Sequence, residues 1–197
     1  ILFADILLVP NALGQHLEFK EGIGPILEPL NNNEDIENLR NSEDIHSTLE
    51  PVYEAVTNIK SKLETNITFI GFAGSPWTVA TYMIEGKGSK DHIKTKTFML
   101  NYPQVFRKLI LKIQDATIEY LSKQIEGGVD VIKLFDSWAN SLPASYIEKF
   151  SLVPMKVIAK EIKKRFPKIP VIVFPRGIGP MYKKFAMVKE FDCVAVD

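Results

Sequence analysis

A few polar residues stand where apolar runs of the sequence break or end, and they are the residues best placed to do chemistry. Asp5 interrupts the run at residues 1–9, Asp136 and Ser137 end a second run, and Arg176 follows a third. In parallel α/β proteins, ligands bind at the carboxyl ends of the strands. We therefore expect carboxylates, a hydroxyl and a cation to face a ligand there.

Asp5 has the most unusual surroundings of these residues. It lies between Ala4 and Ile6 in an otherwise apolar stretch. An ionised carboxylate buried there without partners would cost several kcal/mol of folding free energy. Two interpretations stay open: backbone N–H groups satisfy the carboxylate, or it meets a donor or a cation of a ligand.

The sequence Gly74-Ser75-Pro76 marks the passage from a strand to a helix. Ser75 is a candidate N-cap, and Pro76 suits the first helical position. Such a helix start presents N–H groups to a carboxylate or phosphate, although an ordinary capped helix has the same sequence pattern. Tyr82, about two turns later, faces either a pocket or the core.

The histidines and arginines argue against a catalytic triad or a metal site and indicate one candidate anion-binding residue. The three histidines, His16, His46 and His92, fall in an expected hairpin, loop or helix surface. None of them has the spacing of a catalytic triad or of a metal site. Arg176 is the one arginine that ends a strand. It is therefore the natural anion partner, with a packing or loop-capping role equally open.

Composition excludes several classes of protein. The 197 residues are 46% hydrophobic and 24% charged, with 24 basic and 24 acidic residues, as in a folded globular domain. This balance gives no overall field that would attract nucleic acid or an anionic membrane. Cys193, the single cysteine, favours a reducing compartment, and we expect the cytoplasm. No apolar run approaches the ~18 residues of a membrane span.

Apolar runs predict five strands, at residues 1–9, 67–74, 129–137, 170–177 and 193–197. Each run is nearly continuous rather than alternating, which is typical of parallel strands covered on both faces. Residues 17–30 predict a hairpin with its turn at residues 20–22.

Helical periodicity fills the intervals between the strands. The expected helices lie at residues 49–63, with Pro51 near the start, and at 103–126, 152–166 and 181–190. An acidic, solvated helix should follow residues 31–33. Alternating strands and helices predict an α/β fold, either an open doubly wound sheet or a closed (β/α)8 barrel. Five strands are too few to close a barrel by themselves.

Five blocks of sequence, in matching order and spacing, resemble the uroporphyrinogen decarboxylase family. They read FADILLVP, GFAGSPWT, TYMIEG, LFDSWA and FPRG, at residues 3–10, 71–78, 81–86, 134–139 and 174–177. The resemblance covers essentially the whole chain. It implies a (β/α)8 barrel, commonly a homodimer, that removes four acetate carboxyl groups from uroporphyrinogen to give coproporphyrinogen in haem biosynthesis. It also implies that neither a metal nor an organic cofactor takes part.

The resemblance implies roles for individual residues. Asp5 matches the aspartate that accepts hydrogen bonds from the pyrrole N–H groups, and it would stabilise a protonated ring more plausibly than donate the proton. Tyr82 and Ser137 match residues that contact substrate carboxylates. Four further positions match residues that line the cleft: Ile1, Phe72, Gly74 and Phe135.

Some family features do not occur in this sequence. An arginine-bearing loop would precede Ile1, a late histidine loop would follow Asp197, and Asn140 stands where the family usually has glycine. We expect residues 1–197 to be the central part of one barrel domain, about strands two to six, truncated at both ends and inactive alone. Two alternatives are a cobamide-dependent methyltransferase of the same superfamily, with a zinc site of His and Cys, and a non-catalytic tetrapyrrole-binding fragment.

Overall fold

A parallel sheet forms the centre of the computed structural model, which describes residues 1–2, 4–22 and 24–197. Its strands follow one another in chain order: β3 (Ile70–Gly74), β4 (Val131–Asp136), β5 (Val171–Pro175) and β6 (Cys193–Val194). These four strands lie within the expected runs. Each is shorter than its run, because the ends of the runs continue into turns.

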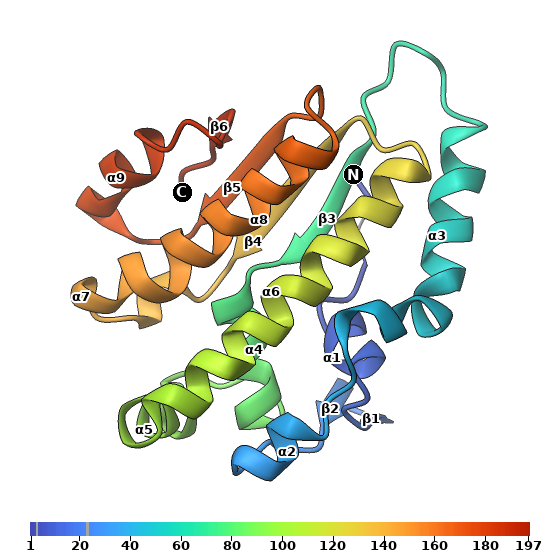
Figure 1. The fold of residues 1–197 in the computed structure, drawn as a ribbon. Coiled ribbons are helices and arrows are strands. Elements are labelled where there is room, and N and C mark those ends of the chain that lie inside the picture. Colours follow the sequence, from blue (N-terminus) through green and yellow to red (C-terminus); the bar gives the residue numbers. More distant parts are fainter. Residues whose placement is uncertain (3, 23) are drawn as a thin grey trace.

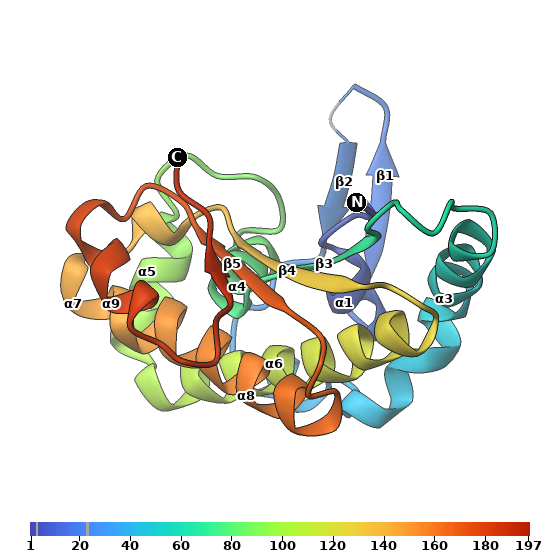
Figure 2. The same ribbon diagram turned by 90° about the horizontal axis from the view of Figure 1, so that it is seen from above.

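Two long helices cover one face of this sheet. Figures 1 and 2 show α6 (Pro103–Glu126) and α8 (Val153–Arg165) on the same side of the strands. Burial therefore alternates along β4, where Ile132 and Leu134 are buried and Lys133 and Phe135 only partly so. The expectation of strands covered on both faces is confirmed for β3, where residues 71–74 are all buried, and was wrong for β4 and β5, whose inner face is partly exposed.

The expected first strand is not formed in the described residues. The Leu2 amide donates to the Ile70 carbonyl (2.8 Å), so the chain begins alongside β3, and then it turns into helix α1 (Leu8–Ala12). The turn is made by Asp5, whose Oδ1 accepts the Leu7 N–H at 2.9 Å. Aspartate favours such turns because its side chain substitutes for a backbone acceptor, and this local bond ends the extended segment.

The segment after α1 confirms the expected hairpin. β1 (Leu17–Lys20) pairs antiparallel with β2 (Gly24–Leu27), and the short acidic helix α2 (Asn33–Glu37) follows. The side chain of Asn32 caps α2 in a reciprocal capping box. Phe3 and Ile23, which fall in the expected first strand and hairpin, lie outside the described residues.

The remaining helices surround the carboxyl ends and the outer face of the sheet. Helix α6 has the predicted bounds, whereas α3 (His46–Lys60) begins before Pro51, which lies inside it. A single 3-10 turn leads into α3 and supplies the helix start that Pro51 was expected to give. The other helices are α4 (Pro76–Glu85), α5 (Ile93–Asn101), α7 (Ala144–Ile147) and α9 (Tyr182–Ala186), the last being shorter than expected.

One apolar core joins the sheet to these helices. Its largest fully buried side chains include Trp77, Phe106 and Tyr120, which come from α4 and α6. No helix of the described part of the chain is long and apolar enough to cross a membrane.

Candidate active site

A cavity of about 390 Å³ opens at the carboxyl ends of β3 and β4. It brings together four of the residues that the sequence singled out, although they come from three separate segments. These four are Asp5, Phe72, Phe135 and Ser137, and Ala4 and Ile6 complete the lining. We call this space the Asp5 cavity.

Asp5 reaches the cavity because it sits in the turn between the extended start of the chain and α1. Its side chain is exposed rather than buried, so the cost of burying an unpaired carboxylate does not arise. Oδ1 accepts one backbone N–H, from Leu7. An ionised carboxylate accepts about four hydrogen bonds, and the remaining capacity can face a ligand with several N–H donors.

Aromatic rings form the wall of the cavity. The ring centroids of Phe72 and Phe135 lie 5.1 Å apart, and those of Phe135 and Phe174 lie 6.0 Å apart. The Lys133 ammonium lies over two of these rings, 4.7 Å from the centroid of Phe135 and 5.4 Å from that of Phe174. Phe72 and Phe135 thus offer apolar faces to a flat ligand, and Phe174 and the Lys133 cation lie next to Phe135 without lining the cavity themselves.

Sequence reasoning missed Lys133. The signal was present, because side chains two residues apart in a strand share a face. Lys133 therefore had to point to the same side as Phe135, and a lysine within an apolar strand is as unusual as Asp5.

Asp136, directly before Ser137, points to the opposite face of β4 and does not line the cavity. It is fully buried, and its carboxylate accepts hydrogen bonds from Thr78 Oγ1 (2.6 Å) and Ser151 Oγ (2.5 Å). Ser151 lies in a π-helical turn, residues 148–152, that precedes α8. The Thr78 hydroxyl also accepts the Trp138 N–H. This network fixes the backbone on both sides of Ser137.

The environment of Asp136 changes its acidity. Burial raises the pKa of its carboxyl to about 6, and the hydroxyls of Ser151 and Thr78 act in the opposite direction.

The start of α4 was expected to bind a ligand anion, but the protein's own buried Asp136 carboxylate lies there, bonded to Thr78. Residues 75–78 are buried, and Ser75 makes no side-chain cap. Pro76 does occupy the first turn, as predicted.

Four predicted site residues do not line the Asp5 cavity. Tyr82 is partly buried against Trp138, with ring centroids 6.5 Å apart. Ile1 is 58% exposed at the start of the chain. Arg176 is exposed beyond the end of β5, where its backbone N–H donates to the Asp136 carbonyl. Their roles towards a ligand stay predictions.

Gly74, the fourth of them, is buried where β3 meets α4. A Cβ at this position would lie 2.8 Å from Val79 Cγ2 and 3.3 Å from Ile6 Cβ. Since Ile6 lines the cavity, the missing side chain lets the cavity wall pack closely on α4.

His92 was expected at the surface, and this was wrong. It is 1% exposed, and its ring centroid lies 5.1 Å from that of Trp138. Its backbone is left-handed (φ 50°), and neither ring nitrogen has a hydrogen-bond partner among the described residues. Burial lowers the pKa of His92, which keeps the ring neutral. The sequence carries no signal that separates a buried histidine from an exposed one here.

Replacing His92 with phenylalanine should stabilise the protein. The variant keeps a ring against Trp138 and removes two unpaired buried nitrogens, so we expect the free energy of unfolding to rise by about 1 kcal/mol. Urea unfolding at neutral pH measures this, with His16→Phe at an exposed position as the control that should change little. A clear loss of stability in His92→Phe would contradict this prediction and would mean either that the nitrogens have partners or that phenylalanine is strained in the left-handed backbone of this position.

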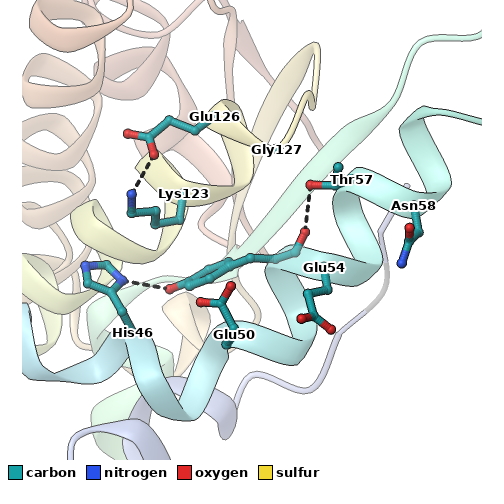
Figure 3. A pocket seen from close by; sticks show the side chains of 9 residues that line it. His46, Glu50, Glu54, Thr57, Asn58, Lys123, Glu126 and Gly127 are labelled. Atoms are coloured by element: carbon teal, nitrogen blue, oxygen red, sulfur yellow. Dashed lines mark hydrogen bonds and ion pairs between the residues drawn. The ribbon is translucent and has the colours of Figure 1, made fainter.

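A larger hollow, about 600 Å³, lies between α3 and α6, and no residue at the carboxyl ends of the strands lines it. Figure 3 shows Lys123 and Glu126 on its α6 side and His46, Glu50 and Glu54 on its α3 side. Lys123 already pairs with Glu126 at 2.7 Å. Two further carboxylates make this α3–α6 groove unsuited to an anionic ligand, and no sequence-predicted site residue lines it.

No group of three or more His, Cys, Asp or Glu side chains that could hold a metal ion occurs among the described residues. Cys193 is exposed and forms no disulfide. Among the described residues, the Asp5 cavity offers one carboxylate, one hydroxyl and two phenyl rings, with Lys133 beside them.

Comparison with known proteins assigns a family to this arrangement. The model of the family "Uroporphyrinogen decarboxylase (URO-D)" matches residues 1–197. The chain is 50% identical over 197 residues to a uroporphyrinogen decarboxylase of Rhodobacter capsulatus and 48% identical to those of Ruegeria pomeroyi and Paracoccus denitrificans. These alignments cover 100% of this chain and 57–58% of the relatives, so the chain spans little more than half of their length.

The fold also matches a solved structure. A methyltransferase from Methanosarcina mazei superposes with a TM-score of 0.80 at 17% identity, over 99% of this chain and 56% of the other. At this identity the likeness concerns the fold alone. It supports an α/β architecture that forms part of a (β/α)8 barrel.

Proposed function

Because the chain belongs to the uroporphyrinogen decarboxylase family, we propose that the protein removes the acetate carboxyl groups of uroporphyrinogen to give coproporphyrinogen. One observation carries this proposal. Asp5, Ser137 and two phenyl rings, from separate segments, share one cavity at the carboxyl ends of the strands. A carboxylate beside apolar rings suits a flat tetrapyrrole whose centre carries N–H donors.

The Asp5 carboxylate accepts hydrogen bonds from the pyrrole N–H groups. Protonation of a pyrrole carbon then gives a cationic ring, and the electron pair of the breaking C–CO₂ bond flows into it as carbon dioxide leaves. The methylene carbon of the arm takes up a proton and becomes a methyl group, and the ring carbon gives up the proton that it gained, which restores the neutral pyrrole. A fixed anion beside the ring stabilises the cation in a site of lowered dielectric, so Asp5 acts as an electrostatic stabiliser and an anchor.

Ser137 is placed to contact a carboxylate arm of the substrate. It lies at the cavity because Asp136 holds the backbone before it and Thr78 binds the Trp138 N–H after it. Tyr82 and Arg176 contact further arms in the complete protein. Neither residue lines the cavity, but each follows or packs on a segment at the carboxyl ends of the strands, Tyr82 on Trp138 and Arg176 after β5.

We further propose that the reaction needs neither a metal nor an organic cofactor, because the protonated ring itself accepts the electrons. The chain supplies the central part of a single barrel. The complete protein acts in the cytoplasm as a homodimer, with small tetrapyrroles and neither nucleic acid nor a membrane as partners.

An anaerobic assay of the complete protein tests the proposed function. Uroporphyrinogen should lose carboxyl groups stepwise, and chromatography of the oxidised products should show porphyrins with successively fewer carboxyl groups. A metal chelator should leave the rate unchanged. Porphyrin binding without carbon dioxide release would instead indicate a binding protein, and a zinc-dependent methyl transfer would indicate the methyltransferase reaction.

A further inference from the structure

Lys133 places a cation on the inner face of the sheet, next to the Asp5 cavity. In the parallel register Phe72 pairs with Lys133, and Phe135 pairs with Phe174. Paired residues of neighbouring parallel strands point to the same face. Lys133 is therefore the direct neighbour of Phe72. Its ammonium extends towards the carboxyl ends of the strands and lies over the next pair on the same face, Phe135 and Phe174.

The surroundings of this ammonium leave its charge without an anion in the described residues. Its contacts there are with the faces of two phenyl rings, which attract a cation only weakly. Asp136, the nearest acidic residue along β4, points to the other face and is bonded to Thr78 and Ser151. A partly buried cation beside an apolar wall gains most from a carboxylate that arrives with a ligand.

We propose that Lys133 is a further substrate-binding residue, which pairs with a carboxylate arm of the tetrapyrrole while Asp5 accepts the pyrrole N–H groups. This inference rests on the proposed function. Neither Lys133 nor Arg176 is among the lining residues of the cavity, but the Lys133 ammonium lies over the ring of Phe135, which lines it, whereas Arg176 is exposed beyond the end of β5. Lys133 lies beside the wall formed by Phe72 and Phe135. The cation and Asp5 can therefore bind different parts of one ligand.

The binding of two stable porphyrins to the complete protein tests this role. Lys133→Met keeps an unbranched apolar stem and removes the charge, and we expect it to weaken uroporphyrin binding roughly tenfold or more, the loss expected for a charged hydrogen bond. Lys133→Arg should retain most of the affinity. Lys168→Met removes one charge at an exposed position before β5 and should bind as the parent does.

Coproporphyrin, which lacks the acetate carboxyls, identifies the arm. If only uroporphyrin binding weakens in Lys133→Met, the partner is an acetate, and if both weaken, the partner is a propionate. Uroporphyrin affinity that is unchanged in a folded Lys133→Met protein overturns the inference, even if the parent decarboxylates uroporphyrinogen. A parent that binds through Lys133 without turnover would instead contradict the proposed function and leave Lys133 as a binding residue.

Discussion

Replacing Asp5 with asparagine in the complete protein should lower kcat for decarboxylation of uroporphyrinogen by about a hundredfold or more, the usual effect of removing one preorganised electrostatic contact. The structure makes asparagine the informative choice. Its side-chain oxygen can still accept the Leu7 N–H that forms the turn into α1. The variant therefore removes the negative charge and keeps the turn.

Two companion variants separate charge from geometry. Asp5→Ala loses both the charge and the turn, so it should be at least as inactive and also about 1 kcal/mol less stable. Asp5→Glu keeps the charge but moves it, and it should recover only part of the activity. Stopped assays under anaerobic conditions, with thermal unfolding of each variant, give both quantities. Turnover equal to the parent in all three would remove Asp5 from the mechanism.

Asp136→Asn should change how stability depends on pH. The folded pKa of Asp136, about 6, lies above its ordinary value of 3.8, so the folded protein binds this proton more tightly than the unfolded chain. In the parent, this residue therefore destabilises the fold increasingly as the pH rises from about 4 to about 6. The full effect of a pKa raised by this much is roughly 3 kcal/mol.

The measurement is the difference in unfolding free energy between parent and Asp136→Asn, taken by urea unfolding from pH 4 to pH 7. Asparagine does not ionise. The unfolding free energy of the variant, relative to that of the parent, should therefore rise by roughly 3 kcal/mol between pH 4 and pH 7. Other acidic groups, such as Asp130 and Asp192 with lowered pKa values, cancel in the difference. A difference that stays constant with pH would mean that Asp136 does not titrate in this window.

Much of the fold could be predicted from the sequence because the spacing of apolar residues, and the Pro and Gly residues at element ends, determine local structure. Helix α6 begins at Pro103 and ends before Gly127, as the pattern predicts. The site could be predicted in part for a related reason: polar residues at strand ends gather at one edge of a parallel sheet. Ser137 follows this rule at the end of β4, and Asp5 lines the same cavity from the turn before α1, although no strand is formed there.

The rest could not be predicted because it depends on single side-chain contacts. One hydrogen bond from Leu7 to Asp5 turns an apolar run into a helix start. Asp136 and Ser137 are adjacent, yet the pleat of the strand sends one into the core and the other to the cavity. His92 is buried only because the segment after α4 folds back on Trp138.

The position of a bound tetrapyrrole tests the assignment of the Asp5 cavity most directly. A crystal structure of the complete protein with coproporphyrinogen should place pyrrole nitrogens within hydrogen-bond distance of the Asp5 carboxylate, at about 2.7–3.2 Å. The macrocycle should lie against Phe72 and Phe135. A tetrapyrrole bound in the α3–α6 groove, or one whose nitrogens do not contact Asp5, would contradict it.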